Sequence, residues 1–404
     1  IMKLHRNIAL GIVYGLEKTL VEKHQAAKVI NRLFKSNLRW GSRDRRTIAQ
    51  AFYDIIRQKR LFHALCGSES EDLNLWYLLG CWIVLNDFQL PEWIEFNKIN
   101  VQEIRSKALV LVQDRRYKYS IPDWLDQMGV KAFGEKTWEK EITSLNIPAN
   151  LIVRVNTQVT TVKKLKYLLK KKYNIITDLV PDYPHALVFE KKQSLQRIKE
   201  YRKGWFEVQD ANSQKISPWL EAESGKYYID ACAGAGGKSL HLANLTKDSS
   251  KIVALDVNSA KLNELRKRCY RNKIQSVRTV DVKDNKILQT LGPDVDGVLI
   301  DAPCSGLGVL KRNPDAKWNM SPEQLTEILK TQEKIIQTYA PLVKKGGKLV
   351  YATCSILPEE NKLQVEKFLN SKLGSKFELE KEHTYFSHLT GFDGFYCARL
   401  IKKM

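Results

Sequence analysis

Hydrophobic and polar residues alternate along this chain with two different periods. Between residues 5 and 115, apolar residues recur at the spacing of an amphipathic α-helix, as in Ile8, Ile12 and Leu16. From about residue 213 onward, short apolar runs of strand type alternate with helical stretches. Such alternation is typical of βαβ units around a parallel sheet. We therefore expect a helical first part and an α/β last part.

The segment between these two parts has a mixed pattern. Strand-like runs at 151–155 and 186–189 flank a helix-like run at 161–172, whose outer face is rich in lysine. This content suits a small α+β unit of ferredoxin-like or RRM-like type that binds RNA, although a lysine face is also consistent with an ordinary solvated surface. We predict three domains: a helical domain at 1–115, an α+β segment at 116–212 and a Rossmann-like domain at 213–404.

The charge of the chain points to a polyanionic partner. Its 404 residues include 66 Lys and Arg against 45 Asp and Glu, a formal net charge of +21. A cationic excess favours nucleic acid because neutralised phosphates release their counterions, although a lysine-rich proteome also produces basic proteins. In the helical part, Arg43, Arg45 and Arg46 stand together, and an RNA contact there competes evenly with a solvated helix face.

The cysteine pattern and the hydropathy exclude several classes of protein. Seven cysteines are present and no two have C-x-x-C spacing, which disfavours a disulfide framework or a zinc site. We therefore expect no metal and a reducing, cytoplasmic setting. The longest apolar run, 75–85, is too short for a bilayer, and no secretory signal opens the chain, so we expect no membrane partner.

A glycine-rich loop follows the first predicted strand of the α/β part, at 226–230, and precedes a helix. The loop consists of Cys232, Ala233, Gly234, Ala235, Gly236, Gly237 and Lys238. Glycines let the backbone approach a ligand closely, which suits NAD, a nucleoside triphosphate or S-adenosylmethionine, but the spacing is not that of a P-loop.

Three further strands are predicted to end in carboxylates, at Asp256, Asp281 and Asp301. Ligands of open α/β sheets bind beyond the carboxyl ends of the strands, where a carboxylate accepts hydrogen bonds from ribose hydroxyls. Asp281 is also placed to accept from an adenine amino group. Either Asp256 or Asp281 alone is compatible with a turn-forming role, but the series beside one glycine-rich loop favours a nucleoside cofactor.

Two cysteines stand just beyond strand ends, in Asp301-Ala302-Pro303-Cys304 and Ala352-Thr353-Cys354-Ser355. Carbon 5 of a pyrimidine accepts a methyl group only after a thiolate attacks carbon 6, and a base must later remove the hydrogen from carbon 5. Two thiols and a carboxylate suit these tasks, whereas most free cysteines are small buried hydrophobes. Amino-group methyltransferases often carry Asn/Asp-Pro-Pro-Tyr/Phe at this position, so the sequence favours carbon over nitrogen chemistry. Spacing does not decide which thiol attacks.

These motifs resemble those of the NOL1/NOP2/Sun family of RNA cytosine-5 methyltransferases. The segments that resemble the family's middle part are 122–125, 154–157 and 208–210, and those that resemble its catalytic domain are the glycine-rich loop, 301–306, 312–315, 353–355 and 393–395. The first 115 residues faintly resemble a NusB-like helical domain, which binds RNA. The loop departs from the family's Cys-Ala-Ala-Pro-Gly-Gly-Lys by losing the proline and gaining a glycine, which predicts a more flexible loop.

The resemblance implies a role for each motif. The Thr-Cys thiol, Cys354, attacks carbon 6, and the Pro-Cys thiol, Cys304, assists release of the product. The residues implied in ligand binding are the glycine-rich loop, Asp256, Asp281 and Asp301 for S-adenosylmethionine and Arg312 for RNA. Asp301 is also implied in catalysis, at the junction of cofactor and cytosine, and Lys238 lies beside the reacting groups.

The resemblance also implies the overall activity. We expect a monomer that forms 5-methylcytosine in RNA, with 16S ribosomal RNA as the expected substrate. One alternative is a methyltransferase that acts on tRNA or on another ribosomal RNA cytosine. The other is a NusB-like RNA-binding or ribosome assembly factor whose methyltransferase domain is inert.

Overall fold

The computed structural model describes residues 4–66, 73–283 and 285–404. It divides into two compact units, of which one comprises Ile1–Ile147 with Val309–Pro322 and the other Pro148–Gly308 with Glu323–Met404. The short segment 309–322 therefore interrupts the α/β part of the chain and belongs to the helical unit. The three predicted domains, with boundaries at 115/116 and 212/213, divide the chain differently, and they remain a prediction about which segments act separately.

The first unit is built from helices, and its described residues contain no strand. The apolar period between residues 5 and 115 places one face of each main helix in a shared core, in which Ile12, Phe52 and Trp82 are almost fully buried. The main helices of the unit are α1 (Arg6–Leu16), α2 (Ala26–Ser36), α3 (Ser42–Arg57), α4 (Lys59–Leu65), α5 (Leu75–Leu85), α6 (Val101–Leu111), α7 (Arg115–Lys118), α8 (Asp123–Phe133) and α9 (Glu135–Leu145).

Segment 309–322 is anchored in this helical unit by buried polar contacts. Its helix α15 (Ala316–Asn319) carries Lys317, which donates from Nζ to Arg57 O at 2.8 Å and to Tyr119 O at 3.2 Å. The next residue, Trp318, packs against the hydrophobic core. The segment is therefore an integral part of the helical core.

The second unit contains a smaller sheet of ferredoxin-like type with the strand order β2-β3-β1-β4, in which all neighbours are antiparallel. Its strands are β1 (Leu151–Val155), β2 (Thr177–Val180), β3 (Tyr183–Phe189) and β4 (Phe206–Val208). Helix α10 (Val162–Tyr173) buries Leu165 and Leu169 against one face of this sheet. The predicted runs at 151–155, 186–189 and 161–172 correspond to β1, β3 and α10. Strands β2 and β4 were not predicted, because both are short and expose part of their side chains.

The larger sheet of the second unit has the order β10-β11-β9-β8-β5-β6-β7. Its strands are β5 (Tyr227–Asp230), β6 (Lys251–Asp256), β7 (Val277–Asp281), β8 (Val295–Asp301), β9 (Val343–Thr353), β10 (Phe377–Tyr385) and β11 (Phe395–Lys402). The first five are parallel, as predicted, but β11 pairs antiparallel with both β9 and β10. The predicted parallel sheet is therefore part of a mixed sheet with two further strands that were not predicted, of which β10 is a largely exposed edge strand whose sequence lacks an apolar run.

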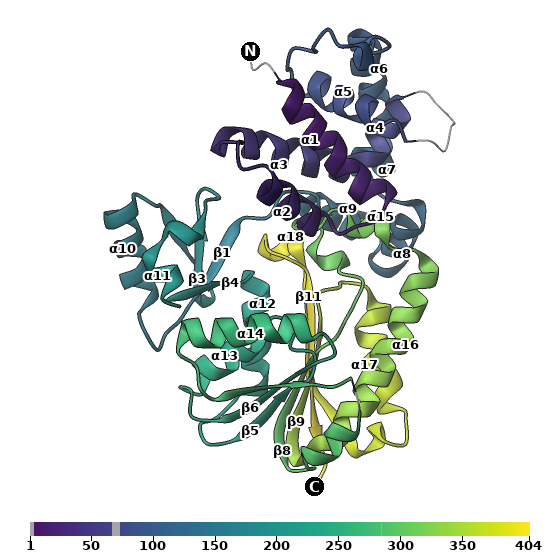
Figure 1. Ribbon diagram of the computed structural model, residues 1–404. Helices are drawn as coiled ribbons and strands as arrows, with labels where there is room; N and C mark the ends of the chain where they lie inside the picture. Colours follow the sequence, from purple (N-terminus) through teal and green to yellow (C-terminus); the bar gives the residue numbers. More distant parts are fainter. Residues whose placement is uncertain (1–3, 67–72, 284) are drawn as a thin grey trace. The chain divides into compact units, whose positions relative to one another are not determined.

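Helices cover both faces of the larger sheet, as in other Rossmann-like folds. Figure 1 shows α13 (Gly237–Leu245) and α14 (Ser259–Asn272) on one side, and α16 (Pro322–Tyr339) and α17 (Lys362–Leu369) on the other. Ile336 of α16 and Phe368 of α17 are buried in the same core as the strands. The remaining helices of the unit are α11 (Lys199–Arg202), α12 (Ala211–Ile216) and α18 (Ser387–Thr390). None of the helices in the described ranges has both the length and the apolar character that a membrane crossing requires.

Candidate active site

The parallel register brings the predicted site residues to one edge of the larger sheet. Asp301, the last residue of β8, pairs with Ala352 of β9, and Asp256 of β6 pairs with Asp281 of β7. The loops that follow β8 and β9 carry Cys304 and Cys354. All of these residues therefore lie beyond the carboxyl ends of the strands, where open α/β sheets bind ligands.

The two thiols are in direct contact. Cys304 Sγ and Cys354 Sγ lie 3.2 Å apart, and both side chains are half-buried. The hydrogen bond with Cys354, together with burial, raises the pKa of Cys304 well above its ordinary value. Cys304 is therefore protonated while the two thiols face each other.

A buried ion pair lies beside the thiols. Lys238 Nζ and Asp301 Oδ2 are 2.5 Å apart, and the Lys238 side chain is almost fully buried. Burial opposes the charged ammonium, but the Asp301 carboxylate more than compensates and raises the pKa of Lys238 above its ordinary value. Negative charge on Cys354 adds to this effect, so Lys238 is a fixed positive charge next to the thiol that stands after β9.

Two glycines of the glycine-rich loop adopt backbone conformations that residues with side chains rarely adopt. Gly234 and Gly236 have φ angles of 55° and 84°, in the left-handed region that favours glycine. A Cβ at position 236 would come within 2.0 Å of Leu265 Cδ1, so the helix α14 packs directly on the loop. A Cβ at position 234 would meet nothing within 4 Å, which leaves an open space above the loop. The loop therefore has the close-approach geometry that a nucleoside cofactor requires.

The two carboxylates at the ends of β6 and β7 accept hydrogen bonds but still have free acceptor capacity. Asp256 accepts from Gly234 N at 2.8 Å with one oxygen and from Asn258 N at 2.8 Å with the other. Asp281 accepts from Ser259 Oγ, and this bond is the largest cause of its lowered pKa. Each carboxylate oxygen has two lone pairs, so both residues fix local turns and still have capacity to accept from a ribose.

The buried side chains of Asp230, the last residue of β5, and of Cys232, the first residue of the loop, lie on the inner side of this turn. Burial is the main reason why the pKa of Cys232 is raised, so its thiol is inert at neutral pH. Asp230 is fully buried, accepts from Ser239 Oγ at 2.6 Å, and has its pKa raised to about 7, chiefly by burial. These two residues support the loop.

A buried network that the sequence did not reveal holds the two cysteine loops together. Glu360 is fully buried and accepts from Ser305 N at 2.8 Å and from Ser305 Oγ at 2.6 Å. Gln332 Nε2 donates to Glu360 Oε1 at 3.1 Å and to Pro303 O at 3.0 Å. Gln332 stands 20 residues or more from both motifs, and Glu360 follows the second motif closely but lies outside it, so neither residue is part of a recognisable local pattern. They fix the backbone from which Cys304 projects.

All four arginines that were predicted to contact RNA belong to the first unit. Arg43 and Arg46 are exposed on α3. Arg45 is half-buried and donates from Nε to Trp40 O at 3.0 Å, so part of its side chain serves the helical fold. Arg312 lies in segment 309–322 and is half-buried.

The fold and this edge of the sheet define an S-adenosylmethionine-dependent methyltransferase. Two family models match the chain. The model described as "16S rRNA methyltransferase RsmB/F" matches residues 217–401, and the "RsmF/B-like, ferredoxin-like domain" matches residues 121–196. The chain belongs to the RsmB/F family of RNA methyltransferases.

Similar proteins agree with this assignment. A probable ribosomal RNA small subunit methyltransferase B from Synechocystis sp. is 33% identical over 364 residues, which cover 81% of this chain and 81% of that protein. The ribosomal RNA small subunit methyltransferase B of Escherichia coli is 33% identical over 299 residues, 72% of this chain and 68% of that protein. The solved structure of PH0851 shares the fold, with a TM-score of 0.83 at 23% identity over 99% of this chain and 100% of that one.

Proposed function

We propose that this RNA methyltransferase forms 5-methylcytosine in 16S ribosomal RNA through a covalent bond between Cys354 and carbon 6 of the target base. The observation that carries the proposal is the 3.2 Å contact between the two thiols beside the Lys238–Asp301 ion pair. A cysteine that serves only as a small buried hydrophobe does not require a second thiol or an ion pair beside it. Two thiols are what a nucleophile and a later proton acceptor require. The curated relatives support ribosomal RNA as the substrate class.

Lys238 and Asp301 prepare the attack. The Lys238 ammonium would offset the negative charge of the Cys354 sulfur as it attacks carbon 6. Asp301 holds that ammonium in place and faces the ring edge with its remaining acceptor capacity. When bound, S-adenosylmethionine supplies an electrophilic methyl group, and the residues that would hold it are the glycine-rich loop, Asp256 and Asp281.

Cys304 completes the reaction. Its hydrogen bond with Cys354 is the largest cause of its raised pKa, and this bond is lost once Cys354 Sγ is bonded to carbon 6. Cys304 would then release its own proton to water, and the resulting thiolate would act as the base that takes the proton from carbon 5. Removal of that proton restores the C5–C6 double bond and expels Cys354 as a thiolate, which frees the product.

The parts that precede the catalytic domain are proposed to bind the RNA. The helical segment 1–115, which faintly resembles NusB-like domains, would contact RNA through Arg43 and Arg46. The α+β segment 116–212 would also bind RNA. Arg312 would contact RNA from segment 309–322. We further propose that the protein acts as a cytoplasmic monomer.

The test uses a strain that lacks the gene, complemented with wild-type, Cys354→Ala or Cys304→Ala protein. Bisulfite sequencing of ribosomal and transfer RNA is expected to reveal one 16S cytosine that is methylated only with the wild type. Cys354→Ala abolishes methylation, and Cys304→Ala accumulates a protein–RNA adduct that is retarded on a denaturing gel.

Other outcomes separate the alternatives. Turnover by Cys304→Ala, with an adduct in Cys354→Ala, reverses the two thiol roles. A methylated cytosine in tRNA or elsewhere in ribosomal RNA replaces the proposed substrate. If every methylated cytosine is still present in the deletion strain, and calorimetry detects no binding of S-adenosylmethionine, the protein is a non-catalytic RNA-binding factor.

A further inference from the structure

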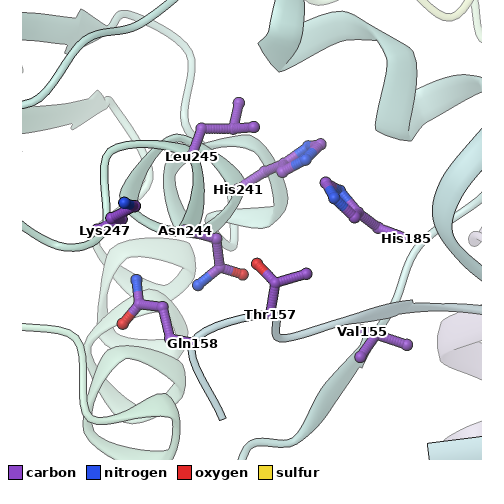
Figure 2. Close-up of a pocket in the computed structure, with 8 residues that line it drawn as sticks. All are labelled: Val155, Thr157, Gln158, His185, His241, Asn244, Leu245 and Lys247. Carbon is purple, nitrogen blue, oxygen red and sulfur yellow. The ribbon is translucent and has the colours of Figure 1, made fainter. Parts of the chain in front are cut away.

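A cavity lies in the α/β unit, between the smaller sheet and helix α13. Its volume is about 640 Å³, which is within the range of small-molecule sites. Its walls come from the end of β1 with the residues that follow it, from His185 of β3, and from the second half of α13 (Figure 2). None of the thiols, carboxylates or glycines of the candidate active site lines it. The cavity is therefore a separate feature of this unit.

His241 is the unexplained group in this cavity. The side chain is 1% exposed, and neither ring nitrogen has a hydrogen-bond partner among the residues that the structure describes. Figure 2 shows the ring directed toward that of His185, and the two ring centroids are 6.0 Å apart in an edge-to-face arrangement. A buried polar group without a partner costs about 1–3 kcal/mol. A ligand that bonds to His241 would remove this cost.

The amides around the histidines are held in fixed orientations. Gln158 Nε2 donates to Ala243 O at 3.0 Å, and Asn244 Nδ2 donates to Asn156 Oδ1 at 3.2 Å. Each bond uses one of the two N–H groups of its amide and fixes the orientation of that amide beside the cavity. The wall is thus preorganised, with polar groups of known direction.

The two imidazoles are neutral. Burial lowers the pKa of His185, and it lowers that of His241 well below the ordinary value. The Arg154 guanidinium, buried nearby and bonded to Gln209 Oε1 at 2.8 Å and Gly237 O at 2.9 Å, lowers both further. A neutral imidazole presents one N–H donor, one acceptor nitrogen and a flat apolar face. Two such rings suit a planar ligand whose edge mixes donors and acceptors.

A metal ion is a poorer match to this site than a planar base. Among the described residues, no third His, Cys, Asp or Glu joins the two histidines in a metal-binding group. By contrast, Val155 and Leu245 add apolar wall, and Thr157 adds a hydroxyl. Lys247 is exposed at the rim, where it is placed to meet a phosphate. A pocket lined by two planar rings and several polar groups, with a cation at its mouth, matches a nucleotide.

We propose that this cavity binds an unpaired base of the RNA substrate other than the methylated one, with His185 and His241 contacting the base and Lys247 contacting its phosphate. The proposal rests on the assignment of the chain as an RNA methyltransferase and not on the roles of the two cysteines. It makes the pocket a specificity site, because an RNA without an unpaired base at the right distance from the target would bind less well.

The experiment crosslinks wild-type protein to purified cellular ribosomal and transfer RNA with ultraviolet light, and then digests with nucleases and trypsin. A nucleotide adduct is expected on the tryptic peptides 155–163, 173–191 or 239–247, which carry the pocket residues. Crosslinking requires no turnover, so the adduct forms even if the proposed methylation chemistry is wrong.

Affinity measurements on the full chain supply the matched controls. His185→Ala is expected to lower RNA affinity about tenfold, the usual scale for one stacked base, with calorimetric binding of S-adenosylmethionine unchanged. Lys247→Asn is expected to lower RNA affinity about threefold. Lys273→Asn, which removes an exposed lysine with a similar positive φ (58° against 53°), is expected to change it less than twofold.

Two results would overturn the proposal. One is adducts confined to other peptides, with His185→Ala binding RNA as tightly as the wild type. The other is displacement of the pocket adduct by free nucleoside monophosphates without any loss of RNA affinity, which would assign the cavity to a free nucleotide.

Discussion

Two buried lysines, one in each unit, show how neighbours decide what a buried cation does. Lys238 and Lys317 are 8% and 2% exposed. The Lys238 ammonium faces the Asp301 carboxylate at 2.5 Å, and its pKa is raised. Within the described parts of the chain, the acceptors of Lys317 are neutral oxygens, including Asn146 Oδ1 at 3.3 Å, and burial lowers its pKa well below the ordinary value.

The difference in pKa separates a chemical role from a structural one. A lysine with a carboxylate keeps its charge and can stabilise a thiolate beside it. A lysine surrounded by carbonyl oxygens has hydrogen-bond acceptors but no carboxylate to oppose burial, which lowers its pKa, and the Arg57 guanidinium lowers that pKa further. Lys317 thus fastens segment 309–322 into the helical core, whereas Lys238 supplies charge at the edge of the sheet.

The largest effect is expected from Lys238→Met, which removes the charge but keeps an unbranched side chain. The single-turnover rate of methylation should fall about a hundredfold or more. The reason is that the attacking sulfur of Cys354 loses the cation beside it, and Asp301 loses its ion-pair partner. Lys238→Arg, which keeps the charge, should recover part of the rate. If Lys238→Met stays within tenfold of the wild type while S-adenosylmethionine still binds, Lys238 has only a structural role and the comparison fails.

The sequence predicted the first of these lysines and not the second, for a physical reason. Lys238 stands in a local motif, a glycine-rich loop between a strand and a helix, and such motifs are visible in one stretch of chain. Lys317 acts through carbonyl oxygens of Arg57 and Tyr119, which are about 200 residues or more away in sequence. Carbonyl acceptors exist at every residue, so no pattern of residue types marks them.

The same distinction explains which parts of the fold were predicted. The parallel strands β5 to β9 are buried apolar runs, and the two thiols were correctly placed beyond two of them. The edge strand β10 is polar because it is exposed, and its pairing with β11 depends on contacts across the sheet. His241 was missed because the sequence of a helix does not indicate whether a histidine in it has a hydrogen-bond partner. Its importance becomes visible only with the cavity beside it.

The second prediction concerns the pH dependence of stability in the two lysine variants. Lys317 binds fewer protons in the folded state than in the unfolded state between its lowered pKa and the ordinary value of 10.5, so its contribution to stability rises with pH in that window. The destabilisation caused by Lys317→Met should therefore grow, by at most about 1.4 kcal/mol per pH unit, between roughly pH 7 and 10.

Lys238 should behave in the opposite way. Its folded pKa is raised above 10.5, so the stabilisation by its ion pair is complete below that value and is lost only as the pH rises through the folded pKa. Urea unfolding of both Met variants, followed by hydrogen exchange in each unit, measures the two slopes. A flat difference for Lys317→Met would show that Lys317 stays charged in its carbonyl cage.

The smallest effect extends the comparison to the surface of α3, where neighbouring arginines differ in the same way. Arg43 and Arg46 are exposed, whereas Arg45 donates to Trp40 O at 3.0 Å and Asn37 O at 3.3 Å. Arg43→Ala and Arg46→Ala should each lower RNA affinity about threefold at low salt and reduce the salt slope by about one, with unfolding unchanged. Arg45→Ala should instead lower the free energy of unfolding by about 1–2 kcal/mol, since its acceptors lose their donor. The contrary outcome is an equal loss of RNA affinity in all three alanine variants, with no loss of stability in Arg45→Ala. That outcome would mean that hydrogen bonding within the unit does not decide which of these arginines is available to RNA.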